Sequence, residues 1–508
     1  MIESFSSQAR QGQMLVGLVL FLVASTGWAQ DSTGIGVDAE PAAIEWSPHT
    51  GAAFDGSPLV GELGRIRVLE NRGRADGPTI EIAFVRFRSD HPDPGPPIFF
   101  LAGGPGGSGI EGSAVVATHP QLRLLEQADV IGVDQRGTGA SVPNLDRLPG
   151  GETVVERLRG AVDRDRLVRT SEAVAAATAD AWRRHGVDLA AYNTRESADD
   201  LDAVRRALGL DRLTLWGASY GSHLGLAYLR RHGQTVERAV LAKVEGPDHT
   251  WKLPSTIDAG LDQVAEWWSS HPAAVGERRD LRARLGELLE GLATEPVVLQ
   301  GVAEDGGSMV LGPLDVQVAV SRALASAEGV AELPARIERW HLGDWDDLLE
   351  TARGLRHVEI AAMPMMMDCA SGASRERWLR IERERRDPQF LLSDAIYAPF
   401  YPEVCGAAGA PDLGETFRGP LESPVPMLLV SGSLDVRTPS ANVEQLLPGL
   451  PGAVHGRILH AGHPARELMS PEYRGLVQAF LRGERLEHFT IRLPRPLFER
   501  SEAVADVR

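Results

Sequence analysis

Short runs of apolar residues, bounded by glycine, proline or aspartate, recur in the first half of the chain and again near its end. Runs of this length between turn residues are typical of buried strands. The pattern predicts strands over Gly61–Arg67, Thr79–Phe87, Pro97–Leu101, Ala128–Asp134, Arg212–Trp216, Arg238–Val244, Pro424–Val430 and Ala453–Leu459. Apolar residues at helical spacing predict helices over Asn193–Leu208, Tyr220–Arg231 and Pro471–Arg482. Because strands and helices alternate, we expect an α/β fold with a mostly parallel sheet.

A long interval separates the predicted strand that ends at Val244 from the one that begins at Pro424. Its roughly 180 residues far exceed the two to six or so of an ordinary loop between a strand and a helix. Apolar periodicity in this interval predicts amphipathic helices over Ile257–Trp268, Glu277–Leu292, Leu314–Ser326, Leu333–Arg339 and Trp345–Ala352. We therefore expect a core at 30–245 and 424–508, with a helical cap at 246–423 over the carboxyl edge of the sheet.

The N-terminal segment has the pattern of a secretory signal peptide. Arg10 precedes the apolar run Met14–Ala24, and small residues stand at the −3 and −1 positions of a cut after Ala29. The run is shorter than the roughly 20 residues of a membrane-spanning helix, although an uncleaved anchor is the alternative. We expect residues 1–29 to be removed, giving a secreted or periplasmic protein without stable membrane insertion.

The net charge argues against a nucleic-acid partner, and the composition is that of a folded globular protein. The 508 residues carry a formal net charge of −18. Nucleic-acid binding needs clustered lysine and arginine, so we expect no nucleic-acid partner. The hydrophobic fraction of 43% and the charged fraction of 24% are ordinary for a folded globular protein.

The chain contains two cysteines, Cys369 and Cys405. Export would place both in an oxidising compartment, where a disulfide is permitted. The alternative is a pair of buried free thiols, because a sequence does not show whether two residues come within bonding range.

A candidate nucleophile stands at Gly217-Ala-Ser-Tyr-Gly221, which fits the pattern G-x-S-x-G. The motif falls between a predicted strand and a predicted helix, as the sharp turn called a nucleophile elbow requires. Ser219 would project from this turn above the sheet, while the two glycines allow close approach of neighbouring backbone. The context therefore predicts Ser219 as the nucleophile of a hydrolase.

The residues that would activate this serine follow in the order acid, then histidine. Asp435 comes after the predicted strand that ends at Val430, and His463 comes after the one that ends at Leu459. In this chain order Asp435 would orient the imidazole of His463, which would accept the proton of Ser219. His460 is the competing base, with a role in packing or at the surface as its alternative.

Glycines after the predicted strand Pro97–Leu101 provide a candidate oxyanion hole. The sequence Leu101-Ala-Gly-Gly-Pro-Gly-Gly-Ser-Gly109 allows backbone N–H groups to approach a developing negative charge. We expect the N–H groups of Gly104 and Tyr220 to be the two donors. A phosphate-binding loop is the rival interpretation, but the Lys-Ser/Thr that closes such a loop is missing. The segment Asp134–Ser141 is expected to brace the glycine loop.

Together, five segments resemble the proline iminopeptidase and tripeptidyl aminopeptidase family of α/β-hydrolases. They are Gly103–Gly109, Asp134–Gly139, Gly217–Gly221, Gly432–Asp435 and Gly462–His463. The resemblance implies the α/β-hydrolase fold and an exopeptidase that removes residues from peptide N-termini, with acidic groups of the cap holding the substrate ammonium. Proline-specific members typically carry histidine where this chain has Ala102, which argues against strict proline specificity. The secreted tripeptidyl type fits better in its length, its signal peptide, its Ser-Tyr-Gly elbow and its pair of cysteines in the cap.

Acidic side chains near the cap are the candidates for the ammonium site. Glu245 and Asp248 follow a predicted strand, and Asp368 precedes Cys369. Each could instead be a solvated residue or a helix cap. The run Met363–Met367 could line an apolar substrate pocket or pack inside the cap.

We expect a peptide or small-molecule substrate with a free N-terminus. One alternative is an esterase or amidase that acts on small neutral substrates with the same triad, and another is an inactive hydrolase used as a binding module. The sequence contains no dinucleotide fingerprint, H-E-x-x-H motif or cysteine cluster, so we expect no cofactor and no metal.

Overall fold

A computed structural model describes residues 41–120, 122–303, 306–395 and 402–498. The expected signal peptide, residues 1–29, lies outside the described residues. Among the described helices, none is long and apolar enough to cross a membrane.

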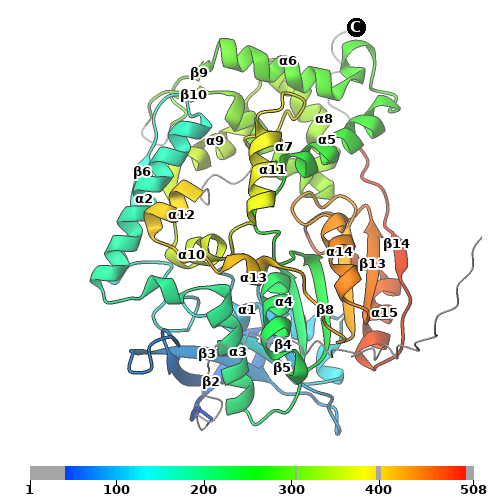
Figure 1. Cartoon of the computed structure of the whole chain (residues 1–508). Coiled ribbons are helices and arrows are strands. Elements are labelled where there is room, and N and C mark those ends of the chain that lie inside the picture. The colour runs from blue at the N-terminus through cyan, green and yellow to red at the C-terminus, as the bar shows by residue number, and fades with distance from the viewer. Residues whose placement is uncertain (1–40, 121, 304–305, 396–401, 499–508) are drawn as a thin grey trace, which may run out of the picture. The chain divides into compact units, whose positions relative to one another are not determined.

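The core of the fold is a ten-stranded sheet with the order β1-β2-β3-β5-β4-β7-β8-β12-β13-β14 (Figure 1). Its antiparallel edge consists of β1 (Glu45–Ala52), β2 (Pro58–Leu69) and β3 (Thr79–Phe87). The remaining strands run parallel to one another: β4 (Ile98–Leu101), β5 (Val130–Val133), β7 (Leu213–Ser219), β8 (Val236–Val244), β12 (Met427–Gly432), β13 (Ala453–Leu459) and β14 (Phe489–Arg492). The predicted mostly parallel sheet is confirmed, and β1 and β14 extend it at its edges.

Helices cover both faces of this sheet, which explains why strands such as β5 and β12 are buried at every position. On one face, α1 (Gly109–Thr118) and α15 (Pro471–Leu481) pack against side chains such as Val85, Trp216 and Leu428. On the other, α3 (Thr194–Ala207), α4 (Tyr220–His232) and α14 (Ser440–Leu446) pack against Phe84, Leu215 and Leu429. Alternate residues of each strand therefore serve separate apolar cores.

The segment between β8 and β12 is mainly helical. Its helices are α5 (Pro254–Ser269), α6 (Leu281–Thr294), α7 (Pro313–Leu324), α8 (Ala327–His341), α9 (Leu349–Arg356), α10 (Ala362–Ser371), α11 (Arg375–Arg385), α12 (Pro402–Ala408) and α13 (Gly414–Arg418). A short hairpin, β9 (Val297–Leu299) with β10 (Met309–Leu311), interrupts them. Helices α5 to α9 have an apolar core of their own, with Leu261, Leu285 and Trp340 at its centre.

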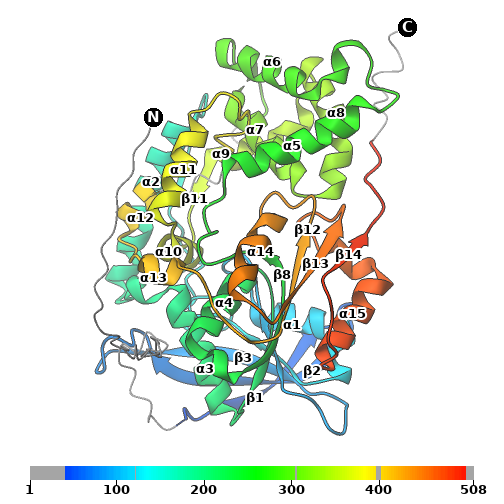
Figure 2. The same ribbon diagram turned by 45° about the vertical axis from the view of Figure 1, so that its right-hand side comes forward.

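A second stretch of the chain joins these helices. Between β5 and α3, β6 (Val155–Arg157) pairs with β11 (His357–Glu359), and α2 (Arg164–Arg184) packs against α12. Both views show α2 beside the α10 to α12 region (Figures 1 and 2). The cap is thus built from two parts of the sequence, although we expected residues 30–245 to belong to the core.

Covalent and backbone contacts fix the cap locally. A disulfide joins Cys369 in α10 to Cys405 in α12, two residues that are 36 positions apart. At the junction of α7 and α8, the carbonyl of Ala325 accepts a hydrogen bond of 2.7 Å from the N–H of His463, whose loop follows β13. A Cβ atom at Gly462 would lie 2.5 Å from the same carbonyl oxygen, so the loop and the cap approach as closely as a glycine allows.

Candidate active site

The turn between β7 and α4 presents Ser219 in an unusual backbone conformation. Ser219 has φ 56° and ψ −130°, values that L-residues adopt only under constraint. The closely packed backbone around the turn provides the constraint, and the flanking glycines permit this packing: a Cβ at Gly217 would lie 2.5 Å from the carbonyl oxygen of Gly221, and one at Gly221 would lie 2.1 Å from that of Leu101. The predicted elbow therefore forms, and its serine sits at the carboxyl edge of the sheet.

Ser219, His463 and Asp435 are connected by hydrogen bonds. Ser219 Oγ lies 3.2 Å from His463 Nε2, and His463 Nδ1 lies 2.9 Å from Asp435 Oδ2. The hydrogen bonds fit a neutral imidazole that donates from Nδ1 and accepts from the serine hydroxyl at Nε2. The structure thus brings together the three residues that the sequence predicted as a triad, and it places them at the ends of β7, β12 and β13.

Asp435 is kept ionised by its surroundings. Its carboxylate accepts hydrogen bonds from the N–H groups of Arg437 and Thr438, both at 2.9 Å, and from Thr438 Oγ1 at 2.6 Å. Burial acts to raise the pKa of Asp435, but the hydrogen bonds and charge of His463, with the bonds from Thr438, outweigh it and lower the pKa to about 2. An ionised Asp435 can hold the imidazole in one tautomer and stabilise its cation.

The competing histidine points elsewhere. His460 Nδ1 lies 2.8 Å from the carbonyl oxygen of Leu493, and its ring packs edge-on against Trp267 with centroids 5.5 Å apart. His463, not His460, contacts Ser219.

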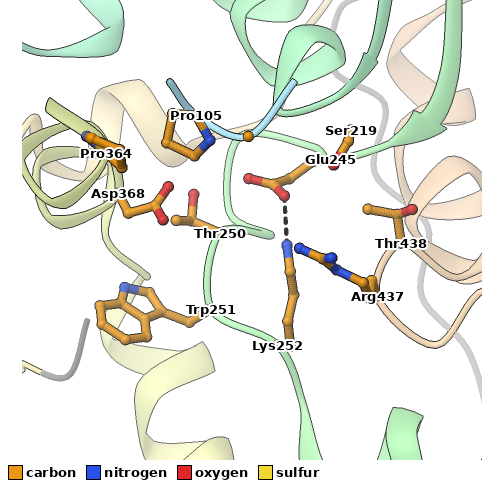
Figure 3. A pocket seen from close by; sticks show the side chains of 11 residues that line it. Pro105, Ser219, Glu245, Thr250, Trp251, Lys252, Pro364, Asp368, Arg437 and Thr438 are labelled. Carbon is orange, nitrogen blue, oxygen red and sulfur yellow. Dashed lines mark hydrogen bonds and ion pairs between the residues drawn. The ribbon is translucent and has the colours of Figure 1, made fainter. Parts of the chain in front are cut away.

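A cavity of about 250 Å³ opens beside the nucleophile (Figure 3). Its lining combines charged, polar and apolar groups: Gly104, Pro105, Ser219, Glu245, Thr250, Trp251, Lys252, Pro364, Asp368, Arg437 and Thr438. The run Met363–Met367 contributes only Pro364 to this wall, while its four methionines are buried in the core. Packing therefore accounts for the methionines.

The predicted oxyanion donors flank this cavity. Tyr220 is the first residue of α4, so its N–H has no partner within the helix. Gly104 lines the cavity in a left-handed conformation, with φ 118°. The loop that carries Gly104 is braced by Asp134, which accepts hydrogen bonds from Ser108 Oγ at 2.7 Å and from the N–H of Ile110 at 3.0 Å. Gly104 and Tyr220 stay the predicted donors.

Of the three acids considered for the ammonium site, Asp248 lies outside the cavity lining. Its two carboxylate oxygens accept hydrogen bonds from the N–H and the hydroxyl of Ser374, each at 2.6 Å. Ser374 is the N-cap of α11, so Asp248 anchors that helix. The structure therefore does not bring it to the substrate.

Glu245 lies in the cavity wall, but it already has a cationic partner. Lys252 Nζ lies 2.5 Å from Glu245 Oε2. Burial acts to raise the pKa of Glu245, but the charges of Lys252 and His223 and the hydrogen bond from Lys252 together outweigh it, so the pKa is lowered. A substrate ammonium would have to compete with Lys252 for this carboxylate.

Asp368 is the acid without a partner. Its carboxyl group forms no hydrogen bond or ion pair with any other described residue, although it lines the same cavity as Ser219. Burial, and next the charge of Glu245, raise its pKa well above the usual range. An unpaired carboxyl group in a cavity wall is unfavourable unless a ligand completes it.

The cavity also contains cations that the motifs did not indicate. Lys252 lies in the loop after β8 and Arg437 in the loop after β12. Only the tertiary structure brings these two loops together at the cavity, so the local sequence does not predict their place there. The sequence did contain one feature that could have drawn attention to Lys252. Of its 52 Lys and Arg residues, only Lys243 and Lys252 are lysines. Lys243 is buried against Glu467 in the 3-10 turn η8 (Arg466–Met469) after His463, and Lys252 is partly buried against Glu245.

Comparison with known proteins supports the fold. The family described as alpha/beta hydrolase fold matches residues 96–292. Serine protease Hip1 of Mycobacterium tuberculosis is 33% identical over 220 residues, which cover 40% of this chain and 40% of that protein. The tripeptidyl aminopeptidase of Streptomyces coelicolor is 26% identical over 379 residues, which cover 69% of this chain and 64% of that protein.

A third relative matches over a shorter stretch of the chain. A putative proline iminopeptidase of Mycoplasma pneumoniae is 42% identical over 59 residues, which cover 11% of this chain and 19% of that protein. Each of these matches spans less than two thirds of the relative's own length. These three relatives are named as a serine protease, a tripeptidyl aminopeptidase and a putative proline iminopeptidase.

Proposed function

The chain is an α/β hydrolase, and from this premise we propose that it is an exported serine peptidase that releases residues from the free N-terminus of a peptide. The observation that carries the proposal is the unpaired carboxyl group of Asp368 in the cavity that also contains Ser219. The names of the relatives agree with peptidase chemistry, and the N-terminal sequence pattern supports export.

The triad would act through an acyl-enzyme. His463 Nε2 accepts the proton of Ser219 Oγ as this oxygen attacks the substrate carbonyl, and Asp435 stabilises the imidazolium that forms. The N–H groups of Gly104 and Tyr220 donate to the oxyanion. His463 then gives its proton to the leaving amine, and water attacks the ester in a second round of the same steps.

Asp368 would select for a free amine. A substrate ammonium would give this carboxyl group the direct ion pair that no described side chain forms with it, and pairing favours its ionised form. Such a charge-assisted hydrogen bond contributes about 1.5–3 kcal/mol. Because the group must be ionised to bind a cation, the preference for free-amine substrates should strengthen as the pH rises through its raised pKa.

The test compares free and N-acetylated peptide arylamides that are otherwise identical. We expect acetylation to lower kcat/KM more than about tenfold in the wild type, and Asp368→Asn to lose most of this difference while retaining turnover of small neutral esters. Asp262→Asn is the matched control, because this acid of α5 lies at the surface in a pair with Arg282. Ser219→Ala should abolish turnover of both classes.

Two outcomes would contradict the proposal. Equal cleavage of free and acetylated peptides by the wild type would exclude an exopeptidase and favour an esterase or amidase with the same triad. If Asp368→Asn keeps its fold but loses turnover of esters and of peptides alike, Asp368 is needed for catalysis on every substrate and does not selectively bind the substrate ammonium.

A further inference from the structure

A chain of buried hydrogen bonds connects α3, α4 and α10 but contributes no residue to the cavity lining. Tyr220 Oη lies 3.0 Å from Thr194 Oγ1, which lies 3.0 Å from Ser371 Oγ. Ser371 Oγ lies 3.0 Å from His223 Nε2, and His223 Nδ1 lies 3.1 Å from the carbonyl oxygen of Gly246. The four side chains are 0–1% exposed, so a group that lost its partner here would stay unpaired.

The two ends of this chain fix the direction in which its hydrogen bonds are donated. The carbonyl oxygen of Gly246 can only accept, so His223 Nδ1 carries the proton, and burial lowers the pKa of His223, which keeps the ring uncharged at neutral pH. His223 Nε2 therefore accepts from Ser371, and Ser371 Oγ accepts from Thr194. Thr194 Oγ1 then accepts from Tyr220, whose pKa is raised by burial. Because every group is paired in one orientation, the chain holds the helices that it joins in fixed relative positions.

These helices and loops carry the parts of the candidate site. Tyr220 directly follows the nucleophile, and Gly246 directly follows Glu245. Ser371 lies three residues after Asp368 in α10, and residues at this spacing are neighbours on a helix surface. The hydroxyl that joins the chain and the carboxyl group proposed for the substrate amine therefore move together.

Helix α10 has few other directional contacts with α3 and α4. Besides the bonds of Ser371, the described residues provide one polar side-chain contact between these helices, from Ser197 Oγ to Met367 Sδ at 3.9 Å. The buried methionines of α10 also pack in the core, but apolar packing is not directional. The disulfide joins α10 to α12, another helix of the cap. The register of α10 against the nucleophile elbow therefore depends on the hydrogen-bond chain.

We propose that Thr194 and Ser371 are positioning residues, whose hydrogen-bond chain holds Asp368 in register with Ser219. The role of Asp368 as the amine site rests on the proposed function. Figure 3 shows Asp368 on one side of the view and Ser219 on the other, so a bound substrate has to span the two. A shift of α10 would displace the amine from the position at which the substrate carbonyl meets the nucleophile. Loss of the chain should thus weaken selection of free amines and leave the triad working.

Three variants separate the hydrogen bond from the shape of the side chain. Thr194→Val removes the hydroxyl and keeps the branched shape, whereas Thr194→Ser keeps the hydroxyl and serves as the rescue variant. Thr235→Val is the matched control, because Thr235 is also buried and its hydroxyl lies 2.9 Å from Tyr228 Oη, towards the other end of α4. If Thr194→Val fails to fold, Ser371→Ala interrupts the same chain and replaces it in each comparison.

The kinetic test uses free and N-acetylated peptide arylamides and a small neutral ester. We expect Thr194→Val to raise KM for the free-amine peptide about fivefold, with kcat and ester turnover within about twofold of the wild type. Thr194→Ser and Thr235→Val should stay within about twofold on every substrate. In an Asp368→Asn background, Thr194→Val should not change the ratio of free to acetylated kcat/KM further, because the group that it positions is already lost.

Hydrogen exchange measured by mass spectrometry tests the position of α10 without any substrate. The amides of Ala362–Ser371 should exchange faster in Thr194→Val than in the wild type, Thr194→Ser or Thr235→Val.

The outcomes distinguish this inference from the proposed function. The inference is wrong if Thr194→Val leaves exchange in α10 unchanged, lowers turnover of amides and esters alike, or has the same effect on the ratio of free to acetylated kcat/KM with and without Asp368→Asn. If the wild type cleaves acetylated peptides as well as free ones, the proposed function fails, and faster exchange of α10 in Thr194→Val would still support the positioning role of the chain.

Discussion

At the scale of single residues, Asp435 links the triad to stability at low pH. Its pKa is lowered from 3.8 to about 2, so the ionised form stabilises the folded state. This contribution is present above pH 4 or so and is lost as the pH falls through about 2, at a cost of about 2 kcal/mol. We expect urea unfolding from pH 5 to pH 2 to show a destabilisation of the wild type that Asp435→Asn lacks. A constant difference between the two proteins over this range would contradict the assignment.

The residues that the sequence predicted are those whose roles depend on a local turn. Ser219 stands in an elbow that two glycines define, and Asp435 and His463 each follow a strand. Lys252 and Arg437 were missed because nothing in their neighbouring residues indicates which loops converge. Glu245 and Asp368 could not be distinguished in the sequence, because the partner that occupies only one of them is a tertiary contact.

At the scale of elements, β8 supports the loop of the catalytic histidine. Lys243 is an extra residue at a bulge where β8 pairs with β7, has φ 50°, and forms a buried ion pair with Glu467 in η8. His463 lies four residues before Glu467. The ion pair thus attaches η8, the turn that follows His463 in the chain, to strand β8 of the sheet.

Loss of one partner of this pair should be costly. Lys243→Met leaves Glu467 buried without a cation, and we expect it to lower the free energy of unfolding by about 3–5 kcal/mol, measured with urea. Lys243→Met/Glu467→Leu should recover much of this loss. Arg212→Gln breaks a more exposed pair with Glu237 and should cost less than about 1 kcal/mol. Equal effects at the two sites would show that Lys243 is not held in a low-dielectric environment.

The disulfide stabilises the cap through its effect on the unfolded chain. Cys369 and Cys405 close a segment of 36 residues, for which the chain-entropy estimate is about 3–4 kcal/mol. We expect reduction to lower Tm in calorimetry, and Cys369→Ala/Cys405→Ala to melt at the temperature of the reduced wild type. An unchanged Tm after reduction, verified by thiol counting, would contradict this expectation.

At the scale of the whole molecule, alternation of strands and helices was sufficient to predict the sheet and the inserted helices. The contribution of β6 and α2 to the cap was not predictable in this way. It depends on antiparallel pairing between residues 155–157 and 357–359, whose paired residues are 200 to 204 positions apart. Local periodicity contains no information about such a contact, and the helix α2 has the same amphipathic pattern as a helix of the core.

The hydrogen bond between His463 and Ala325 ties the reactivity of the site to the position of the cap. If α7 and α8 swung outward as a rigid body, Ala325 would pull on the backbone of the catalytic base or release it. An opening wide enough to admit a folded domain would therefore displace His463 from Ser219 and make the triad inactive. A ligand small or extended enough to enter the cavity without displacing α7 and α8 would meet an intact base, so the proposed action on chain ends would leave folded neighbouring proteins untouched.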